Sequence, residues 1–294
     1  MSKFNISKCS YIHGDKLIET PRGKFIITPK SNDKVKIFRY LEQRDFPFFL
    51  PMENSISDSY ELYPYVEDDI LFEDKAIDLV HILSLLHIKT TSYQEVAMDS
   101  VKKMYEDISN KIEQLDAYYH KLHDDIEAHI YMAPDEYLLV RNISLLYENL
   151  FLSKRYLDDW YDLKKDSTRE RVVLLHKQPC LSNFVDRKTP YFIHWDLSEK
   201  GYPISDFLYF FKQHYSILEM NSLFQIYQSK FQFTKDEMYL FFSLLLLDCE
   251  ISFSSDHYKN TILVYESIFY SSKVNSFILK QNQKDQETNE SKFD

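Results

Sequence analysis

The chain has 294 residues, of which 44% are hydrophobic and 28% charged, so it is long and apolar enough to form one large globular domain or two lobes. Its 35 basic and 46 acidic residues leave a formal net charge of -11, which argues against a protein that binds the backbone of nucleic acids. The most apolar run, residues 238–247, is far shorter than the about 20 apolar residues that cross a bilayer, so we expect no membrane span.

The cysteines and glycines exclude further classes of protein. The three cysteines are far apart and form no C-x-x-C pair, which is typical of a reducing cytoplasm and offers no zinc site. Only three glycines occur, at Gly14, Gly23 and Gly201. Loops that wrap phosphates depend on glycine because it has no Cβ, so the chain contains no P-loop, no Rossmann fingerprint and no glycine-rich kinase loop.

The first 66 residues predict a small strand-rich lobe and a connector. Residues 16–19 and 24–28 read as strands around a turn with Pro and Gly. Residues 33–44 have apolar side chains at helical spacing. Residues 60–66 read as a strand, and the proline within it predicts a sheet edge or a strand end.

The rest of the chain, residues 67–280, predicts a large helical lobe. An amphipathic helix is expected over residues 74–87, and a Pro-containing break divides two long helices that we expect to pack as an antiparallel pair. Residues 234–237 read as a capping box before another helix. The polar residues 281–294 predict a disordered tail. The remaining expectations are long helices over 93–130 and 134–165, short strands at 172–175, 183–185 and 191–194, and helices after residue 205.

The most informative stretch is residues 176–206, HKQPCLSNFVDRKTPYFIHWDLSEKGYPISD. It has an eight-residue motif that begins with His176 and ends with Asn183, then an apolar strand leading into His194-Trp195-Asp196, then Asp206. This order resembles the H-G-D-x-x-x-x-N, I-D-W-[DE] and later Asp of aminoglycoside phosphotransferases and choline-kinase-like proteins. The resemblance implies an α+β, bilobal protein kinase-like fold with a small strand-rich N-lobe and a large helical C-lobe.

The same resemblance shows two substitutions in the expected machinery. Gln178 stands where the family has its catalytic Asp, and His194 stands where the family has its magnesium-binding Asp. His176 and Asp206 match residues that the family uses as structural anchors, and Asn183 matches a residue that holds the metal and its nucleotide.

The residues that would bind the nucleotide in this family are also replaced. Kinase-like folds pair a Lys on the third strand with a Glu on the next helix. Here Thr28 stands near the position of that Lys, Lys30 comes two residues later, and the next helix offers Lys34 and Lys36 before its first Glu, Glu42. Lys30 and Asn183 are therefore the weak candidates for cofactor binding.

A second, weaker resemblance lies before the motif. Residues 60–67 are similar to the family's connector. Leu86-His87-Ile88-Lys89-Thr90 resembles the L-H-x-x-T that closes the next helix in bacterial members, including spore-coat kinase-like proteins.

These substitutions weaken the family's chemistry. Gln178 can orient a hydroxyl but cannot take its proton, and losing a general base costs about 10²–10⁴ in rate. Magnesium prefers carboxylate oxygens, so Asn183 with His194 predicts a poor metal site. Asp196 could rescue the site if its loop shifts. A covalent mechanism through Cys180 and His176 is disfavoured because no third orienting group is evident.

Together these features predict a catalytically degenerate, pseudokinase-like protein that acts as a binding or scaffolding module in the cytoplasm of a bacterium. No catalytic or metal-binding residue is assigned. ATP and magnesium are implied only by the alternative, a small-molecule phosphotransferase with a displaced site at Asp196 and Asn183. The third alternative is an unrelated helical interaction protein. The expected partner is an unidentified protein or small molecule, and neither nucleic acid nor membrane is expected.

Overall fold

A computed structural model describes most of the chain, and its residues divide into two compact units. The described residues are 7–12, 15–29, 32–50, 54–55, 60–66, 71–185, 189–248 and 250–290. The sheet unit comprises Met1–Thr91, Val173–Phe210 and Ile226–Phe231, and the helical unit comprises Ser92–Val172, Phe211–Gln225 and Gln232–Asp294. The predicted lobes at residues 1–66 and 67–280 stay a prediction.

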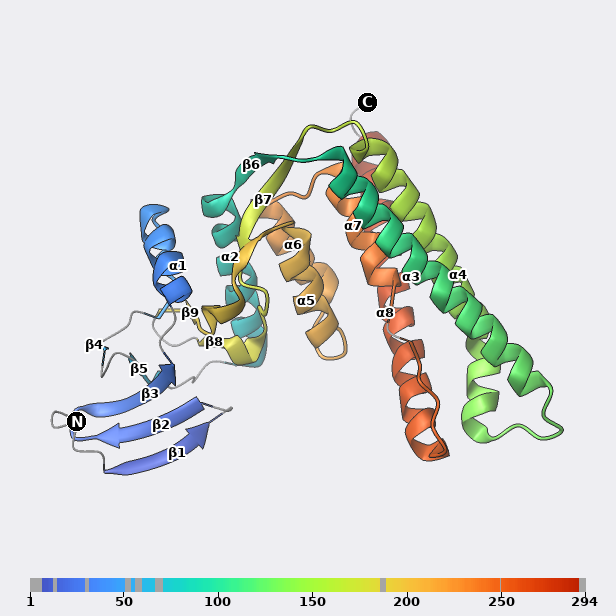
Figure 1. Cartoon of the computed structure of the whole chain (residues 1–294), viewed down its shortest axis with the longest axis horizontal. Helices are drawn as coiled ribbons and strands as arrows, with labels where there is room; N and C mark the ends of the chain where they lie inside the picture. The colour runs from blue at the N-terminus through green and yellow to red at the C-terminus, as the bar shows by residue number, and fades with distance from the viewer. Residues whose placement is uncertain are drawn as a thin grey trace. The chain divides into compact units, whose positions relative to one another are not determined.

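The sheet unit begins with a five-stranded antiparallel sheet in the order β1-β2-β3-β5-β4 (Figure 1). The predicted hairpin is confirmed, because the Thr20 hydroxyl donates to the carbonyl oxygen of Gly23 at 3.0 Å and Gly23 has a φ of 130° that disfavours other residues. Pro64 is the last residue of its strand, as predicted. The strands are β1 (Lys8–Ile12), β2 (Asp15–Thr20), β3 (Gly23–Pro29), β4 (Asn54–Ser55) and β5 (Tyr60–Pro64).

The two faces of this sheet differ in chemistry. Ile18, Phe25 and Leu62 form a buried apolar cluster. Because successive side chains of a strand point to opposite faces, Glu61 and Tyr63 lie on the face opposite Leu62. There they line a cavity together with residues of helix α1 (Asn32–Gln43).

Helix α2 (Phe72–Thr90) and a series of short elements also belong to the sheet unit. Helix α2 buries an apolar stripe and ends in the predicted L-H-x-x-T. Strand β7 (Arg169–Leu175) pairs through its second half with β10 (Glu199–Gly201), a strand that the sequence did not predict. The elements between them are a 3₁₀ turn η1 (Leu181–Asn183), the paired strands β8 (Phe184–Val185) and β9 (Tyr191–Phe192), and a second 3₁₀ turn η2 (Trp195–Leu197).

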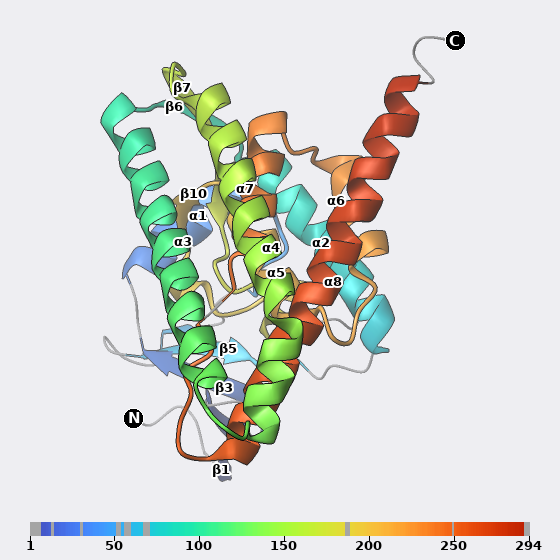
Figure 2. The ribbon, with the colours of Figure 1, turned by 90° about the vertical axis from the view of Figure 1, so that its right-hand side faces the viewer.

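The helical unit is built around long helices that lie side by side (Figure 2). The predicted break before Pro134 is confirmed, because Pro134 is the first residue of α4 and the carboxylate of Glu136 accepts the backbone N–H of Ala133 at 2.8 Å. The capping residue Glu237 likewise accepts the N–H of Thr234 at 2.9 Å. The helices are α3 (Met98–Glu127), α4 (Pro134–Lys164), α7 (Lys235–Leu246) and α8 (His257–Glu290), and β6 (Ser92–Glu95) pairs with the first half of β7.

Helices α5 (Ile204–His214) and α6 (Met220–Lys230) each contribute residues to both units. Helix α8 extends to Glu290, so residues 281–290 are helical where the sequence predicted disorder. Adding residues to an existing helix costs little compared with starting one, and half of this segment is Gln or Glu, which favour helix. No helix among the described residues is long and apolar enough to cross a membrane.

Candidate active site

The loop after β7 is held by the buried carboxylate of Asp206, in the first turn of α5. Its Oδ2 accepts the backbone N–H of His176 and its Oδ1 accepts the N–H of Lys177, both at 2.8 Å. Lys177 has a φ of 74°, a conformation that few non-glycine residues adopt. Two charge-assisted hydrogen bonds from adjacent amides therefore fix the turn that precedes Gln178.

Two residues of the L-H-x-x-T at the end of α2, His87 and Thr90, make hydrogen bonds that hold Asp206 and β7 in place. His87 is fully buried, with Nε2 3.2 Å from Oδ2 of Asp206 and Nδ1 2.5 Å from the hydroxyl of Tyr227. Because the carboxylate of Asp206 accepts, the proton of this contact is on Nε2 of His87. Thr90 accepts the backbone N–H of Leu174 at 3.0 Å and so ties the end of α2 to β7.

His176 is buried in an aromatic environment. Its Nε2 donates to the carbonyl oxygen of Ile193 at 2.8 Å, and its ring lies 4.8 Å from the rings of both Phe192 and Trp195. Burial lowers the pKa of His176 below its usual value, although the nearby charge of Asp206 opposes the shift. A neutral ring in this position braces the strand that leads to His194. The sequence disfavoured a nucleophilic role for Cys180 with His176, and the thiol of Cys180 lies 3.1 Å from the hydroxyl of Ser182.

The two substituted residues of the motif, Gln178 and His194, both form hydrogen bonds with the retained Asn183. The Nδ1 of His194 lies 2.9 Å from Oδ1 of Asn183, and Nδ2 of Asn183 donates to the carbonyl oxygen of Gln178 at 3.0 Å. Since an amide oxygen only accepts, the proton of this contact is on His194. His194 has a left-handed backbone, with φ 61° and ψ 57°. Both polar atoms of the Asn183 side chain are therefore used within the protein.

Asp196 forms an ion pair with Lys34 of α1, the helix on which kinase-like folds carry a glutamate. The ammonium of Lys34 on α1 lies 2.8 Å from Oδ1 of Asp196. The Lys34 side chain is 6% exposed, whereas that of Asp196 is 51% exposed. Lys34 also lies over the ring of Tyr63, 5.6 Å from its centroid. The sequence indicated the reversed charge at Lys34 but not its contact with Asp196.

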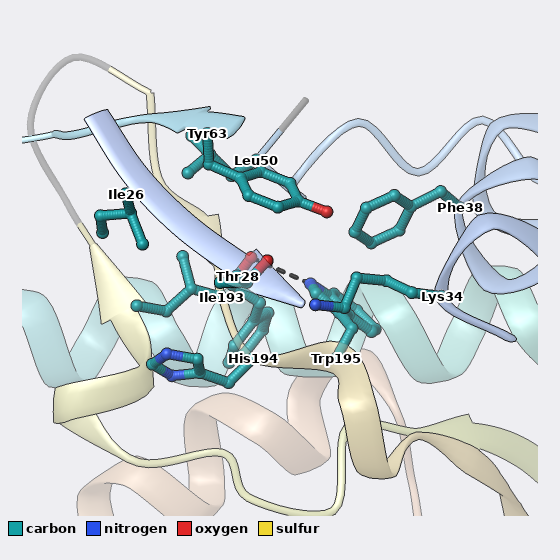
Figure 3. A pocket seen from close by; sticks show the side chains of 10 residues that line it. Ile26, Thr28, Lys34, Phe38, Leu50, Tyr63, Ile193, His194 and Trp195 are labelled. Atoms are coloured by element: carbon teal, nitrogen blue, oxygen red, sulfur yellow. Dashed lines mark hydrogen bonds between the residues drawn. The ribbon is translucent and has the colours of Figure 1, made fainter. Parts of the chain in front are cut away.

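A narrow cavity of about 40 Å³, the cleft cavity, lies between these groups. Figure 3 shows the ring of Phe38 and the hydroxyl of Tyr63 facing one another, the ammonium of Lys34 entering from α1, and the imidazole of His194 turned away from that ammonium. Burial and the hydrogen bond from its hydroxyl to Glu61 raise the pKa of Tyr63, so it stays a neutral phenol. The lining residues are Ile26, Thr28, Lys34, Phe38, Leu50, Tyr63, Phe192, Ile193, His194 and Trp195.

These positions do not fit a magnesium–nucleotide complex. Thr28 lines the cleft cavity at the expected Lys position, with its buried hydroxyl unbonded among the described residues. Lys30 lies outside the described residues. Binding sites for small molecules have volumes of about 300–1,000 Å³. The cleft cavity is several times smaller, and none of its described lining residues carries a carboxylate. Asp196, which contacts the lining residue Lys34, is paired with that ammonium.

Comparison with known proteins identifies the fold. No family model and no curated protein matches the sequence. An aminoglycoside phosphotransferase from Alicyclobacillus acidocaldarius matches 96% of this chain and 93% of its own, with a TM-score of 0.71 and 11% identity. The AMP-bound complex of a spectinomycin phosphotransferase matches 92% of this chain and 89% of its own, with a TM-score of 0.54 and 13% identity.

The chain therefore has a protein kinase-like fold, with a small antiparallel sheet near the N-terminus followed by a mostly helical remainder. More particularly, it has the form of that fold seen in aminoglycoside phosphotransferases. The predicted fold class is thus confirmed. These matches argue against the alternative of an unrelated helical protein. At 11–13% identity they establish the fold alone.

Proposed function

We propose that this protein is a catalytically degenerate, pseudokinase-like binding or scaffolding module that does not transfer phosphate. The observation that carries the proposal is the hydrogen bond between Nδ1 of His194 and Oδ1 of Asn183, at 2.9 Å. Asn183 is the one oxygen ligand that the motif retains. Because an imidazole N–H occupies that oxygen, a metal ion would first have to displace it.

The contact between Lys34 and Asp196 supports the same proposal. Asp196 is the residue that could have rescued metal binding, and a metal ion would compete there with an ammonium only 2.8 Å away. Phosphoryl transfer depends on metal ions that neutralise the phosphates and on a residue that orients the acceptor hydroxyl. Gln178 can supply only the second of these, by a hydrogen bond.

In this proposal the retained anchors serve the fold. Asp206 and His87 position the loop of Gln178 through hydrogen bonds among buried groups. His176 braces the following strand. The proposed setting is the cytoplasm of a bacterium, which suits the free thiols of Cys9 and Cys180.

A phosphotransferase with a displaced site is the second candidate, and one observation favours it. Lys34 brings an ammonium to the edge of the cleft cavity, next to the half-exposed carboxylate of Asp196. A lysine beside a carboxylate could hold a phosphate and its metal if the two separated. That arrangement would also require the Asn183 side chain to leave His194.

Thermal unfolding with ATP, alone and with Mg²⁺ or Mn²⁺, separates the two candidates. We expect the melting temperature of the wild-type chain to change by less than about 1 °C, because the cleft lacks room and metal ligands. A ligand at 100 times its Kd would stabilise the protein by about 2.7 kcal/mol, which corresponds to a rise of several degrees.

The Lys34→Met variant is the matched control for this experiment. A magnesium-dependent rise in the wild type that is lost in Lys34→Met would contradict the proposal and support the displaced site. The same small change in both proteins would support the pseudokinase. Methionine keeps most of the unbranched apolar chain of the buried lysine and lacks its ammonium, so the variant mainly tests the charge.

A further inference from the structure

The exposed face of helix α8 carries a row of mostly apolar side chains, which we call the α8 stripe. Its members follow one another at alternating intervals of four and three residues. Because a helix turns by about 100° per residue, these positions lie within an arc of about 100° on one side of the helix. Tyr258, Tyr265 and Leu279 are between 61% and 78% exposed. The α8 stripe consists of Tyr258, Ile262, Tyr265, Phe269, Ser272, Ser276 and Leu279.

The core of the helical unit uses a different face of α8. Val264, Val274 and Ile278 are buried on that other face. Figure 2 shows α8 beside α4, and at the start of α8 the Nδ1 of His257 lies 3.0 Å from Oδ1 of Asp135 on α4. The helix therefore has a second apolar face beyond the one that its own core requires. Exposed apolar patches of this kind mark interaction surfaces.

The spacing of the α8 stripe is typical of a helix that packs against another helix. Alternating intervals of four and three place one side chain at the seam every 3.5 residues, which is the repeat of a two-stranded coiled coil. The stripe covers three such repeats, or about 32 Å of helix. It contains tyrosine and phenylalanine, which protein interfaces favour, and no charged residue interrupts it. The expected occupant is a helix with the same repeat.

The sizes of the side chains fit a second copy of α8 that runs in the opposite direction. In an antiparallel pair centred between residues 270 and 271, Phe269 of one copy faces Ser272 of the other, and Tyr265 faces Ser276. Each large side chain then meets a small one, as close packing requires. A parallel pair would instead place Phe269 against Phe269 and Ser272 against Ser272, which alternates crowding with voids.

The charges beside the stripe fit the same orientation. Glu266 and Lys273 each follow a stripe residue, so they lie along one edge of it. In the antiparallel pair this edge meets its own copy, and Glu266 of each copy faces Lys273 of the other. The same geometry brings Lys259 toward Lys280 at the ends, where Lys280 already lies 3.9 Å from Glu219 of its own chain. A parallel pair would form no ion pair between these edges.

We propose that the protein forms a homodimer in which two α8 stripes pack antiparallel. In this dimer the apolar ends of the stripe also match, because Ile262 of one copy faces Leu279 of the other. The apolar contacts supply the affinity, and the ion pairs of Glu266 with Lys273 fix the direction. The α8 stripe contains no residue of the candidate active site, so the inference does not depend on the proposed function.

Sedimentation velocity of the full chain between about 1 and 100 µM tests the proposal. We expect a dimer with a Kd of about 10 µM or lower. Tyr265→Glu places a charge within the apolar seam and should raise this Kd at least about tenfold. Tyr93→Glu is the matched control, because Tyr93 is 69% exposed and lies on β6, outside the stripe. A chain that stays monomeric at about 100 µM, or a dimer that Tyr265→Glu does not weaken, would overturn the proposal.

Charge reversal tests the antiparallel direction. Glu266→Lys and Lys273→Glu each place like charges opposite one another and should raise the Kd about threefold to tenfold. The double variant restores opposite charges and should return to within about twofold of the wild type. These two positions are about 10 Å apart along one helix, so the recovery has to come from the second copy. Glu106→Lys, at an exposed glutamate of α3, is the control. Two single variants without effect, or a double variant without recovery, would contradict the antiparallel dimer.

Discussion

Replacing Asp206 with alanine is expected to lower the free energy of unfolding by about 3–5 kcal/mol. The change removes a fully buried carboxylate that accepts the backbone N–H groups of His176 and Lys177 and contacts the ring of His87. Three donors, of which those of His176 and His87 are buried, would be left without an acceptor, and each unsatisfied buried group costs about 1–3 kcal/mol. The loss should be visible as a lower midpoint of urea unfolding, with an unchanged slope.

Two further variants make this result specific. Asp206→Asn retains one acceptor oxygen and should lose less than Asp206→Ala. Asp196→Ala removes a half-exposed carboxylate with a single ion pair and should change the free energy of unfolding by less than about 1 kcal/mol. If Asp206→Ala were no more destabilising than Asp196→Ala, the proposed role of Asp206 as the anchor of the loop would be wrong.

Replacing Trp195 with alanine is expected to have a loss of similar size, about 3–5 kcal/mol. Trp195 is 1% exposed, and its ring lies beside those of Phe38, Phe46, Phe192 and His176. Its indole N–H donates to the carbonyl oxygen of Phe192 at 2.9 Å. The substitution creates a large void and leaves a backbone acceptor without its donor.

Trp195→Phe is the matched control, since it keeps a ring and loses only the hydrogen bond and part of the volume. We expect it to cost about 1–2 kcal/mol. Equilibrium unfolding monitored by circular dichroism measures both variants. A cost for Trp195→Ala below that of Trp195→Phe would contradict the packing described for this region.

The scaffold could be predicted from the sequence because its signals are local. Each of three helices has a signal that lies within a few residues of the sequence. These signals are the capping box at Thr234, the proline that begins α4 and the apolar stripe of α2. The spacing of the motif residues from His176 to Asp206 was sufficient to predict the fold class, although the chain has no glycine-rich loop. Strand β10 was missed because three residues, Glu199 to Gly201, carry no alternating pattern.

The candidate site could be predicted only in part, because its contacts join distant segments. Lys34 was recognised as a reversed charge, but its pairing with Asp196 crosses 162 positions of the chain and has no local signal. The burial of Glu61 could not be predicted either, because a strand that reads Y-E-L-Y-P does not indicate which of its residues are buried. His194 was recognised as a substitution, yet its left-handed backbone, which accompanies its contact with Asn183, could not be read from residue types.

The substituted positions around the cleft are paired with one another. Where an active kinase-like site would present a lysine on β3 and two metal ligands, this chain has Thr28 on β3, with His194 bonded to Asn183 and Lys34 bonded to Asp196. Its own side chains thus pair with Asn183 and Asp196, the two candidate metal ligands.

Equilibrium binding of ATP to the wild-type chain, measured by titration calorimetry with and without Mg²⁺, is the decisive test of the proposed pseudokinase role. We expect no saturable heat up to millimolar ATP and no effect of Mg²⁺. Saturable, magnesium-dependent binding with a micromolar Kd would contradict it, because the side chains of Asn183 and Asp196 would then have to exchange their internal partners for the metal.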